Sequence, residues 1–119
     1  MGVMIRHAET VEAETVTSEG AEGVAIRWLI DEGDPGAEHF VMRQFEVAPG
    51  GHTPRHRHAW EHEAYVLSGR GTVVTADGEQ PIRTGDVVLV PAEDDHQFLN
   101  TGNAPLRFLC LIPARHPPP

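Results

Sequence analysis

Three histidines in one short segment have the residue type and the spacing of metal ligands. His56, His58 and His62 fall within seven residues, in the run His-Arg-His-Ala-Trp-Glu-His. Side chains at positions i and i+2 of an extended strand share a face, so His56 and His58 can reach one point, and a tight turn can return His62 to it. Imidazole is a common ligand of first-row transition metals. The segment therefore predicts a site for one divalent ion.

The segments that must position these histidines have the composition of β-strands. Glycine and proline interrupt the chain every eight to twelve residues, and the short runs between them are rich in β-branched and aromatic residues. This pattern is typical of an all-β sandwich or barrel, and Asp77-Gly78 predicts a hairpin. One predicted strand is expected to stop at Pro49-Gly50-Gly51. The predicted strands cover residues 24–30, 40–47, 64–67, 72–75, 87–90, 96–99 and 106–112.

Length, charge and cysteine content narrow the class of protein. The 119 residues suit one domain, which we divide into an N-terminal strand or arm (1–23), a barrel (24–113) and a proline-rich tail (114–119). A formal charge of −9 argues against nucleic acid and anionic membranes as partners. Cys110 is the single cysteine, which excludes an internal disulfide, and the absence of lysine excludes Schiff-base chemistry. Without a membrane span or a leader pattern, we expect a cytoplasmic protein.

Two spaced motifs make the chain resemble the cupin family. The first motif of that family is Gly, five residues, His-x-His, three or four residues, Glu, six residues, Gly. The matching positions are Gly50, His56, His58 and Gly69. His62 stands where the family has glutamate, and its neighbour Glu63 also fits the looser spacing. We favour His62, because it alone keeps six residues before the final glycine and shares a strand face with the apolar residues that follow.

The second cupin motif places a fourth histidine in the site. It reads Gly, five residues, Pro-x-Gly-x-x-His, three residues, Asn, and it matches Gly85, Pro91, His96 and Asn100, with Glu93 in place of the inner glycine. This substitution affects a turn and not a ligand. The resemblance implies that His96 is the fourth metal ligand, brought to the others by strand pairing.

The resemblance covers about residues 24–113 and implies a double-stranded β-helix, the jelly-roll barrel of the cupins. A closer likeness to small single-domain cupins with an all-histidine site is carried by residues 40–43, 49–51, 60–63 and 108–113. That subgroup implies a homodimer that binds a small organic molecule. It also implies one Mn²⁺ or Fe²⁺ ion, with Ni²⁺, Zn²⁺ or Cu²⁺ as alternatives, and oxygenase-type chemistry.

Four neutral imidazoles leave the charge of a divalent ion uncompensated, whereas a glutamate ligand would cancel one unit. Such a site favours an anionic additional ligand. It also raises the reduction potential of the metal above that of a site with a glutamate ligand. Four ligands on an octahedral ion leave two positions open, which favours catalysis over a closed structural site. We therefore expect a mononuclear non-haem oxygenase, such as a dioxygenase. The alternatives are a metal-dependent binding or sensor protein, and a non-redox isomerase or lyase. No side chain is an evident general base.

Strand alternation also predicts a substrate pocket. In the last predicted strand, Phe108, Cys110 and Ile112 share one face, and turning this face inward keeps Arg107 out of the barrel. In the strand over residues 40–47, the more apolar face carries Arg43 inward. An arginine inside a barrel needs an anionic or carbonyl partner. We therefore expect Arg43 to hold a substrate carboxylate or to orient an anion at the metal.

Overall fold

The computed structural model describes residues 2–114, and its fold is all-β, as the composition predicted. Residues 115–119, which make up most of the expected proline-rich tail, lie outside the described residues. No helix within residues 2–114 is long and apolar enough to cross a membrane. The elements are η1 (Ala8–Thr10), β1 (Glu14–Thr15), β2 (Glu22–Ile30), β3 (Phe40–His52), β4 (His62–Ser68), β5 (Arg70–Thr75), β6 (Gly78–Arg83), β7 (Val87–Val90), β8 (His96–Leu99) and β9 (Leu106–Pro113).

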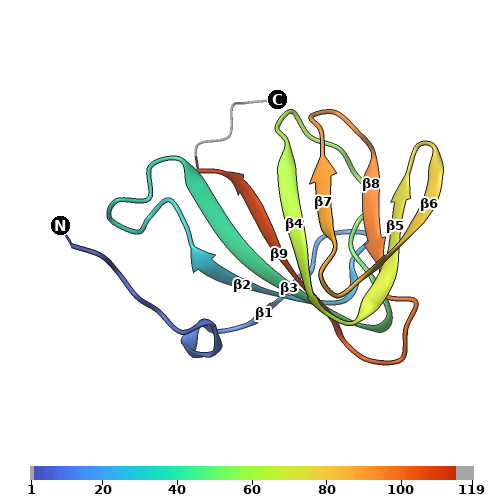
Figure 1. Ribbon diagram of the computed structural model, residues 1–119, viewed down its shortest axis with the longest axis horizontal. Coiled ribbons are helices and arrows are strands. Elements are labelled where there is room, and N and C mark those ends of the chain that lie inside the picture. Colours follow the sequence, from blue (N-terminus) through green and yellow to red (C-terminus); the bar gives the residue numbers. More distant parts are fainter. Residues whose placement is uncertain (1, 115–119) are drawn as a thin grey trace.

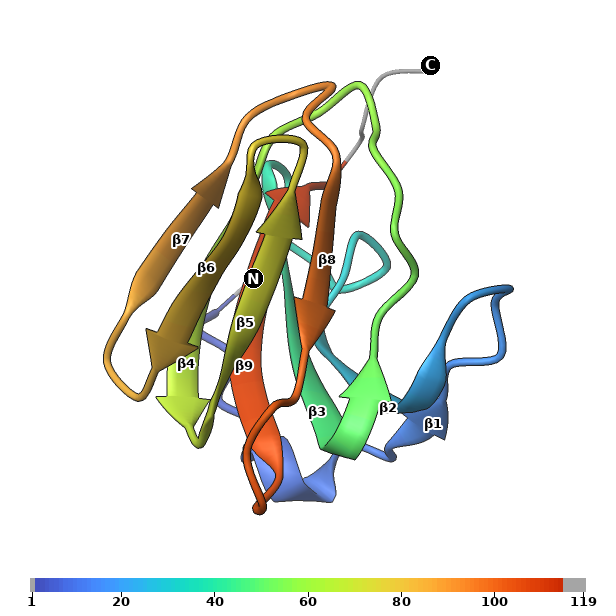
Figure 2. The same ribbon diagram turned by 90° about the vertical axis from the view of Figure 1, so that its right-hand side faces the viewer.

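The strands form one strongly curled antiparallel sheet. Its order is β6-β5-β8-β3-β9-β4-β7, with β2 on β3 and the short β1 on β2. Figure 1 shows β9, β4 and β7 facing β8, β5 and β6 across the interior, and Figure 2 shows the same curl from the side. Strand β3 takes part in both halves, because it pairs with β9 along most of its length and with β8 at its end. This arrangement is the double-stranded β-helix that the resemblance implied.

The prediction that the second strand stops at Pro49 was wrong, because β3 continues through the glycine pair to His52. The Gly50 N–H donates to the Asn100 carbonyl over 3.1 Å, and the Asn100 N–H donates to the Gly51 carbonyl over 3.0 Å. A Cβ atom at Gly51 would lie 2.5 Å from the Glu22 carbonyl oxygen. Glycine here therefore permits close packing of β2 against β3. The pattern that predicted a turn instead marks a bend within the strand.

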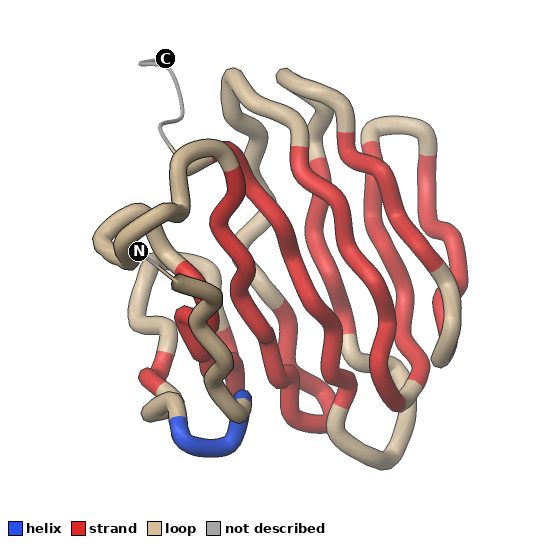
Figure 3. Tube along the Cα trace, turned by 60° about the vertical axis from the view of Figure 1, so that its left-hand side comes forward, coloured by secondary structure: helices blue, strands red, loops and turns tan. Residues whose placement is uncertain are grey.

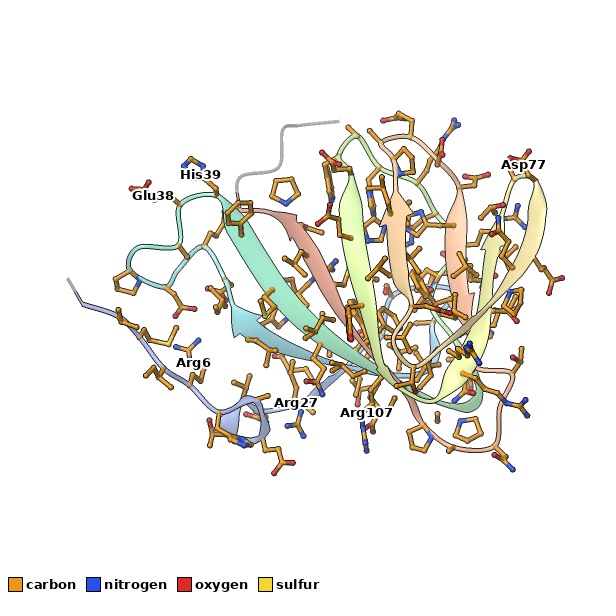
Figure 4. All side chains as sticks on the ribbon, viewed as in Figure 1. Arg6, Arg27, Glu38, His39, Asp77 and Arg107 are labelled. Carbon is orange, nitrogen blue, oxygen red and sulfur yellow. The ribbon has the colours of Figure 1, made fainter. Side chains whose placement is uncertain are left out.

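Alternation along β4 and β9 separates the core from the outer surface. Phe108 is 1% exposed and stacks on both Phe98 and Phe45, with ring centroids 4.5 and 5.3 Å away. Such pairs add about 0.5–1.5 kcal/mol each beyond the area that they bury. Arg107 points away from the barrel (Figure 4) and pairs with Glu46. The main core consists of Val24, Val47, Ala64, Val66, Val73, Ile82, Phe98, Leu106, Phe108 and Cys110.

The N-terminal arm lies against the outside of β2 (Figure 3). Arg6 donates to the Leu29 carbonyl over 2.6 Å and forms two bonds with the Asp34 carboxylate. The guanidinium lowers the pKa of Asp34. Arg27 in β2 donates to the Ala8 carbonyl. These contacts direct the chain into β1, which pairs with β2 beside the barrel opening.

Candidate metal centre

Backbone hydrogen bonds between two distant segments bring the histidines together. The loop over residues 53–61 rises along β8 (Figure 2) and carries His56 and His58. The His56 N–H donates to the His96 carbonyl over 3.2 Å, and the His96 N–H donates to the His56 carbonyl over 3.0 Å. The Glu93 N–H donates to the His58 carbonyl over 2.7 Å. The histidine loop is therefore held by backbone bonds at both of its ligand positions.

Three imidazoles form a cluster that can hold a metal ion, and a fourth adjoins it. The ligand atoms of His56, His58 and His96 all lie within 4.8 Å of one another. His62, at the start of β4, places its Nε2 atom 3.0 Å from His96 Nε2, and its ring centroid lies 5.1 Å from that of His58. His62 and His96 are 4% and 3% exposed, whereas Glu63 faces outward. The structure therefore brings together all four histidines that the sequence suggested.

Hydrogen bonds on the outer edges of two rings direct their inner nitrogens toward the centre. His96 Nδ1 lies 2.9 Å from the Asp94 carbonyl oxygen, and His58 Nδ1 lies 3.2 Å from the Trp60 carbonyl oxygen. A carbonyl only accepts, so each Nδ1 carries the proton, and each Nε2 of the neutral ring is left with a free lone pair. Trp60 also stacks on His58, with a centroid distance of 4.5 Å and an interplanar angle of 3°. These contacts have the form of outer-shell support for metal ligands.

The environment keeps the imidazoles of His56, His58 and His62 neutral. Burial lowers the pKa of His62 to about 3, and the neighbouring His96 and His58 rings add to the effect. Burial of the ring among the other histidines likewise lowers the pKa of His56 to about 4, although His56 is the most exposed of the four residues. The pKa of His58 is lowered mainly by burial. Neutral imidazoles offer lone pairs at neutral pH, which is the state that metal binding requires.

The donor set fits a divalent first-row ion. Two imidazole nitrogens that bind one ion at about 2.1 Å in cis positions lie about 3.0 Å apart. The Nε2 atoms of His62 and His96 have this separation of 3.0 Å. Four nitrogen donors suit zinc, copper, iron and nickel, and they do not select one metal by ligand type.

A cavity of about 510 Å³ opens onto the histidines. This size is in the range of small-molecule sites. Arg43 lines it beside two aromatic rings, with its guanidinium carbon 5.7 Å from the Trp28 centroid and 5.0 Å from that of Phe45. Its Nη2 atom donates to Cys110 Sγ over 2.9 Å, and its buried Nε has no acceptor among the described residues. The cavity is lined by residues 14–18 and by Ile26, Trp28, Arg43, Phe45, Thr53, Pro54, Phe98, Phe108, Cys110 and the four histidines.

The predicted pocket residues fall into two groups. Arg43, Phe108 and Cys110 line the cavity. Ile112 shares their face of β9 but lies beyond the cavity, where it packs with Val41, Ala114 and Trp60 in a second small core. The structure therefore does not bring Ile112 to this cavity, because a shared strand face does not imply a shared position along the barrel.

Sequence reasoning missed one side of the cavity mouth and the aromatic residues beside Arg43. Residues 14–18, expected only to belong to an N-terminal strand or arm, make one side of the cavity mouth. The Trp28 and Phe45 rings both lie beside the Arg43 guanidinium, and the β2–β3 register places Trp28 directly opposite Arg43. A separate hollow of about 490 Å³ lies between the edge strands β6 and β7 and includes His96 but no other member of the cluster. The cavity lined by aromatic residues is therefore the one that reaches the whole histidine site.

This fold and this site define a cupin. Residues 43–112 match the Cupin domain family, and the chain belongs to that family. Among solved structures, the polyketide cyclase RemF from Streptomyces resistomycificus is 38% identical, with a TM-score of 0.90, and the match covers 98% of this chain and 83% of that one.

Two curated relatives have other activities. The oxalate-binding protein of Thermotoga maritima is 27% identical, and the match covers 93% of each chain. The 1-methylthio-D-xylulose 5-phosphate methylsulfurylase of Rhodospirillum rubrum is 35% identical over 66% of this chain, and the match spans half of that relative's length. Similarity to relatives with such different activities shows the family and does not by itself choose among the reactions.

Proposed function

We propose that this protein is a metal-dependent, non-redox enzyme that acts on a small, largely apolar molecule with several carbonyl groups, as a polyketide cyclase does. The observation that carries the proposal is the junction of a four-histidine cluster with an aromatic cavity that contains one guanidinium. Similarity to RemF over nearly the whole chain supports the same choice. The non-redox alternative, placed last on sequence alone after the oxygenase and the binding or sensor protein, therefore becomes the leading one.

The residues divide the work by position. His56, His58, His62 and His96 would hold a divalent ion, which supplies Lewis-acid activation of a carbonyl group. Arg43 would donate a hydrogen bond from its guanidinium to a second oxygen of the substrate, because its side chain lines the cavity. The aromatic walls orient a flat carbon skeleton and exclude water.

Ring closure joins a carbon that lies between two carbonyl groups to the carbon of a third carbonyl group. A proton must leave the first carbon, and the oxygen of the third carbonyl takes up a proton and is then lost as water. Glu14 is the one carboxylate among the described residues that line the cavity. It stands on β1, at the mouth, where it can exchange protons with solvent. We assign Glu14 the role of proton acceptor, a role that no residue received from sequence reasoning.

The test begins with the metal. Protein from unsupplemented cells is analysed for Mn, Fe, Ni, Zn and Cu, then stripped and reloaded with each ion. Loaded protein is incubated with a synthetic linear poly-β-ketone thioester, and products are followed by mass spectrometry together with an oxygen electrode. We expect loss of water with ring formation and no oxygen uptake. His56→Ala should abolish the reaction, and His39→Ala, at an exposed histidine outside the site, should leave it unchanged.

Each other outcome rejects the proposal, and two of the outcomes favour a specific alternative. Oxygen consumption coupled to substrate loss would support the oxygenase that the sequence suggested, with Mn²⁺ or Fe²⁺ as the metal. Tight ligand binding without any product would support a binding or sensor protein. The Thermotoga relative is named as a binding protein. Protein that binds none of the five ions would exclude all metal-dependent reactions.

We further propose a homodimer. The outer face of β4 and β7 exposes apolar side chains, including Tyr65, Val87 and Leu89, of which Val87 is 75% and Leu89 61% exposed. Exposed apolar groups in adjacent strands favour burial against another protein, and the family resemblance favours a second copy. Light scattering after size exclusion should give a dimer mass for the natural chain and a monomer mass for Leu89→Glu. A monomer in both cases would reject the proposal.

A further inference from the structure

A continuous chain of hydrogen bonds links the cavity arginine to the histidine cluster. Arg43 Nη2 lies 2.9 Å from Cys110 Sγ, which lies 3.0 Å from His62 Nδ1. His62 Nε2 lies 3.0 Å from His96 Nε2, and His96 Nδ1 lies 2.9 Å from the Asp94 carbonyl oxygen. Cys110 is 2% exposed, so water does not compete for its sulfur.

The two ends of this chain determine the direction of every bond in it. The Asp94 carbonyl only accepts, so neutral His96 carries its proton on Nδ1 and presents a lone pair at Nε2. His62 must then donate from its own Nε2, which leaves its Nδ1 as an acceptor. The donor to that Nδ1 is the Cys110 thiol. Arg43 at the other end only donates, so the sulfur accepts from it.

We propose that Cys110 is a positioning residue for the metal ligand His62, donating to its Nδ1 in the metal-free protein and accepting from the same atom in the metal-loaded protein. This inference rests on the proposed role of His62 as a ligand. A metal ligand must present a lone pair at Nε2, so the His62 proton has to be on Nδ1 in the loaded state. Ligating histidines are commonly oriented by a hydrogen bond from their other ring nitrogen, and here the nearest partner is sulfur in place of the usual carboxylate or carbonyl.

The exchange conserves protons. His62 gives up the proton on Nε2 and takes one up on Nδ1, so the imidazole stays neutral. The thiol hydrogen rotates away from Nδ1, and the sulfur then accepts from Arg43 and from His62 together. A group at position 110 must therefore both donate and accept. Serine meets this requirement and alanine does not, which separates the proposed role from the packing role that Cys110 also has in the core.

The first experiment reads tautomers directly. Long-range ¹H–¹⁵N correlation spectra of the metal-free protein should show His62 protonated on Nε2, and His58 and His96 protonated on Nδ1. In the zinc-loaded protein His62 should be protonated on Nδ1. If the proton of His62 is on Nδ1 in the metal-free protein, the proposal is overturned, whatever reaction the enzyme catalyses. The spectra therefore test this proposal independently of the activity assays.

The second experiment compares Cys110→Ala with Cys110→Ser by zinc titration calorimetry. Outer-shell partners are worth about 10–100-fold in metal affinity. We expect a loss of this size for Cys110→Ala and less than about threefold for Cys110→Ser. The unfolding temperature of each metal-free variant measures the packing contribution separately. Natural affinity in Cys110→Ala, or equal losses in both variants, would show that Cys110 only fills space.

Discussion

Glu93 has a backbone conformation that favours glycine, and this provides a quantitative test of the structure around the site. Its φ angle is 69°, the single positive value for a non-glycine residue within residues 2–114. It occupies the position at which the second cupin motif has glycine. Its N–H donates to the His58 carbonyl over 2.7 Å, and the turn is closed by a 3.3 Å bond from the Asp94 N–H to the Pro91 carbonyl. A turn that contains a strained residue thus holds the histidine loop in place.

The size of the effect follows from two opposing contributions. A left-handed conformation costs a residue with a side chain about 1–2 kcal/mol. Glycine relieves that cost but makes the unfolded chain more flexible, which costs about 0.4–1 kcal/mol. Glu93→Gly should therefore raise the free energy of unfolding by about 0.5–1 kcal/mol. At about 2.1 cal/mol/K per residue, 119 residues have an unfolding entropy of about 250 cal/mol/K, so Tm should rise by about 2–4 °C.

Scanning calorimetry of the metal-free proteins in the presence of a chelator measures this change. Glu93→Ala is the matched control, because it removes the carboxylate but keeps the Cβ atom that causes the strain. The control should stay within about 0.5 kcal/mol of the natural protein. If Glu93→Gly melts at or below the temperature of Glu93→Ala, the turn is not strained and the reasoning fails.

Four further predictions concern the site and the barrel. Zinc at 100 times its Kd should stabilise the natural protein by about 2.7 kcal/mol, or about 11 °C in Tm, and His62→Ala should lose most of this shift in thermal melts with and without metal. In the metal-free protein His56 and His62 have pKa values of about 4 and 3, below the ordinary 6.5, so the unfolded chain binds more protons between pH 6.5 and 4. Stability should therefore fall as the pH drops from 7.5 to 5, seen as a lower urea midpoint, and a midpoint that is constant or rises on acidification would contradict the assigned neutral state. Arg43→Met should raise KM for a carbonyl-rich substrate at least tenfold and leave the metal content unchanged, and metal loss on analysis would count against a substrate role. Gly69→Ala should prevent soluble expression or lower the urea midpoint sharply. The φ angle of Gly69 is 89°, and a Cβ atom there would lie 2.5 Å from the Pro105 carbonyl oxygen. An unchanged midpoint would show that the turn can relax.

Much of the fold could be predicted from local patterns. Alternation along residues 62–68 and 106–113 predicted which side chains are buried, because neighbouring strand residues point to opposite faces. The glycine pair at residues 50–51 was misread as a turn, because the local signals for a turn and for a bent strand are alike. Strand β6 carries Pro81 and only one buried residue, so it has no apolar pattern to reveal it.

The sequence by itself determined that the chain is all-β, that it has two cupin motifs, and that histidines at fixed spacings are available for a metal. These properties depend on residue type and on separation along the chain. Only the tertiary structure decided that His62 Nε2 and His96 Nε2 lie 3.0 Å apart and that Arg43 reaches Cys110. It also placed residues 14–18 on the cavity and Ile112 outside it. Such contacts arise from pairing between strands that are far apart in sequence, and pairing depends on register across the whole curled sheet, which no short segment encodes.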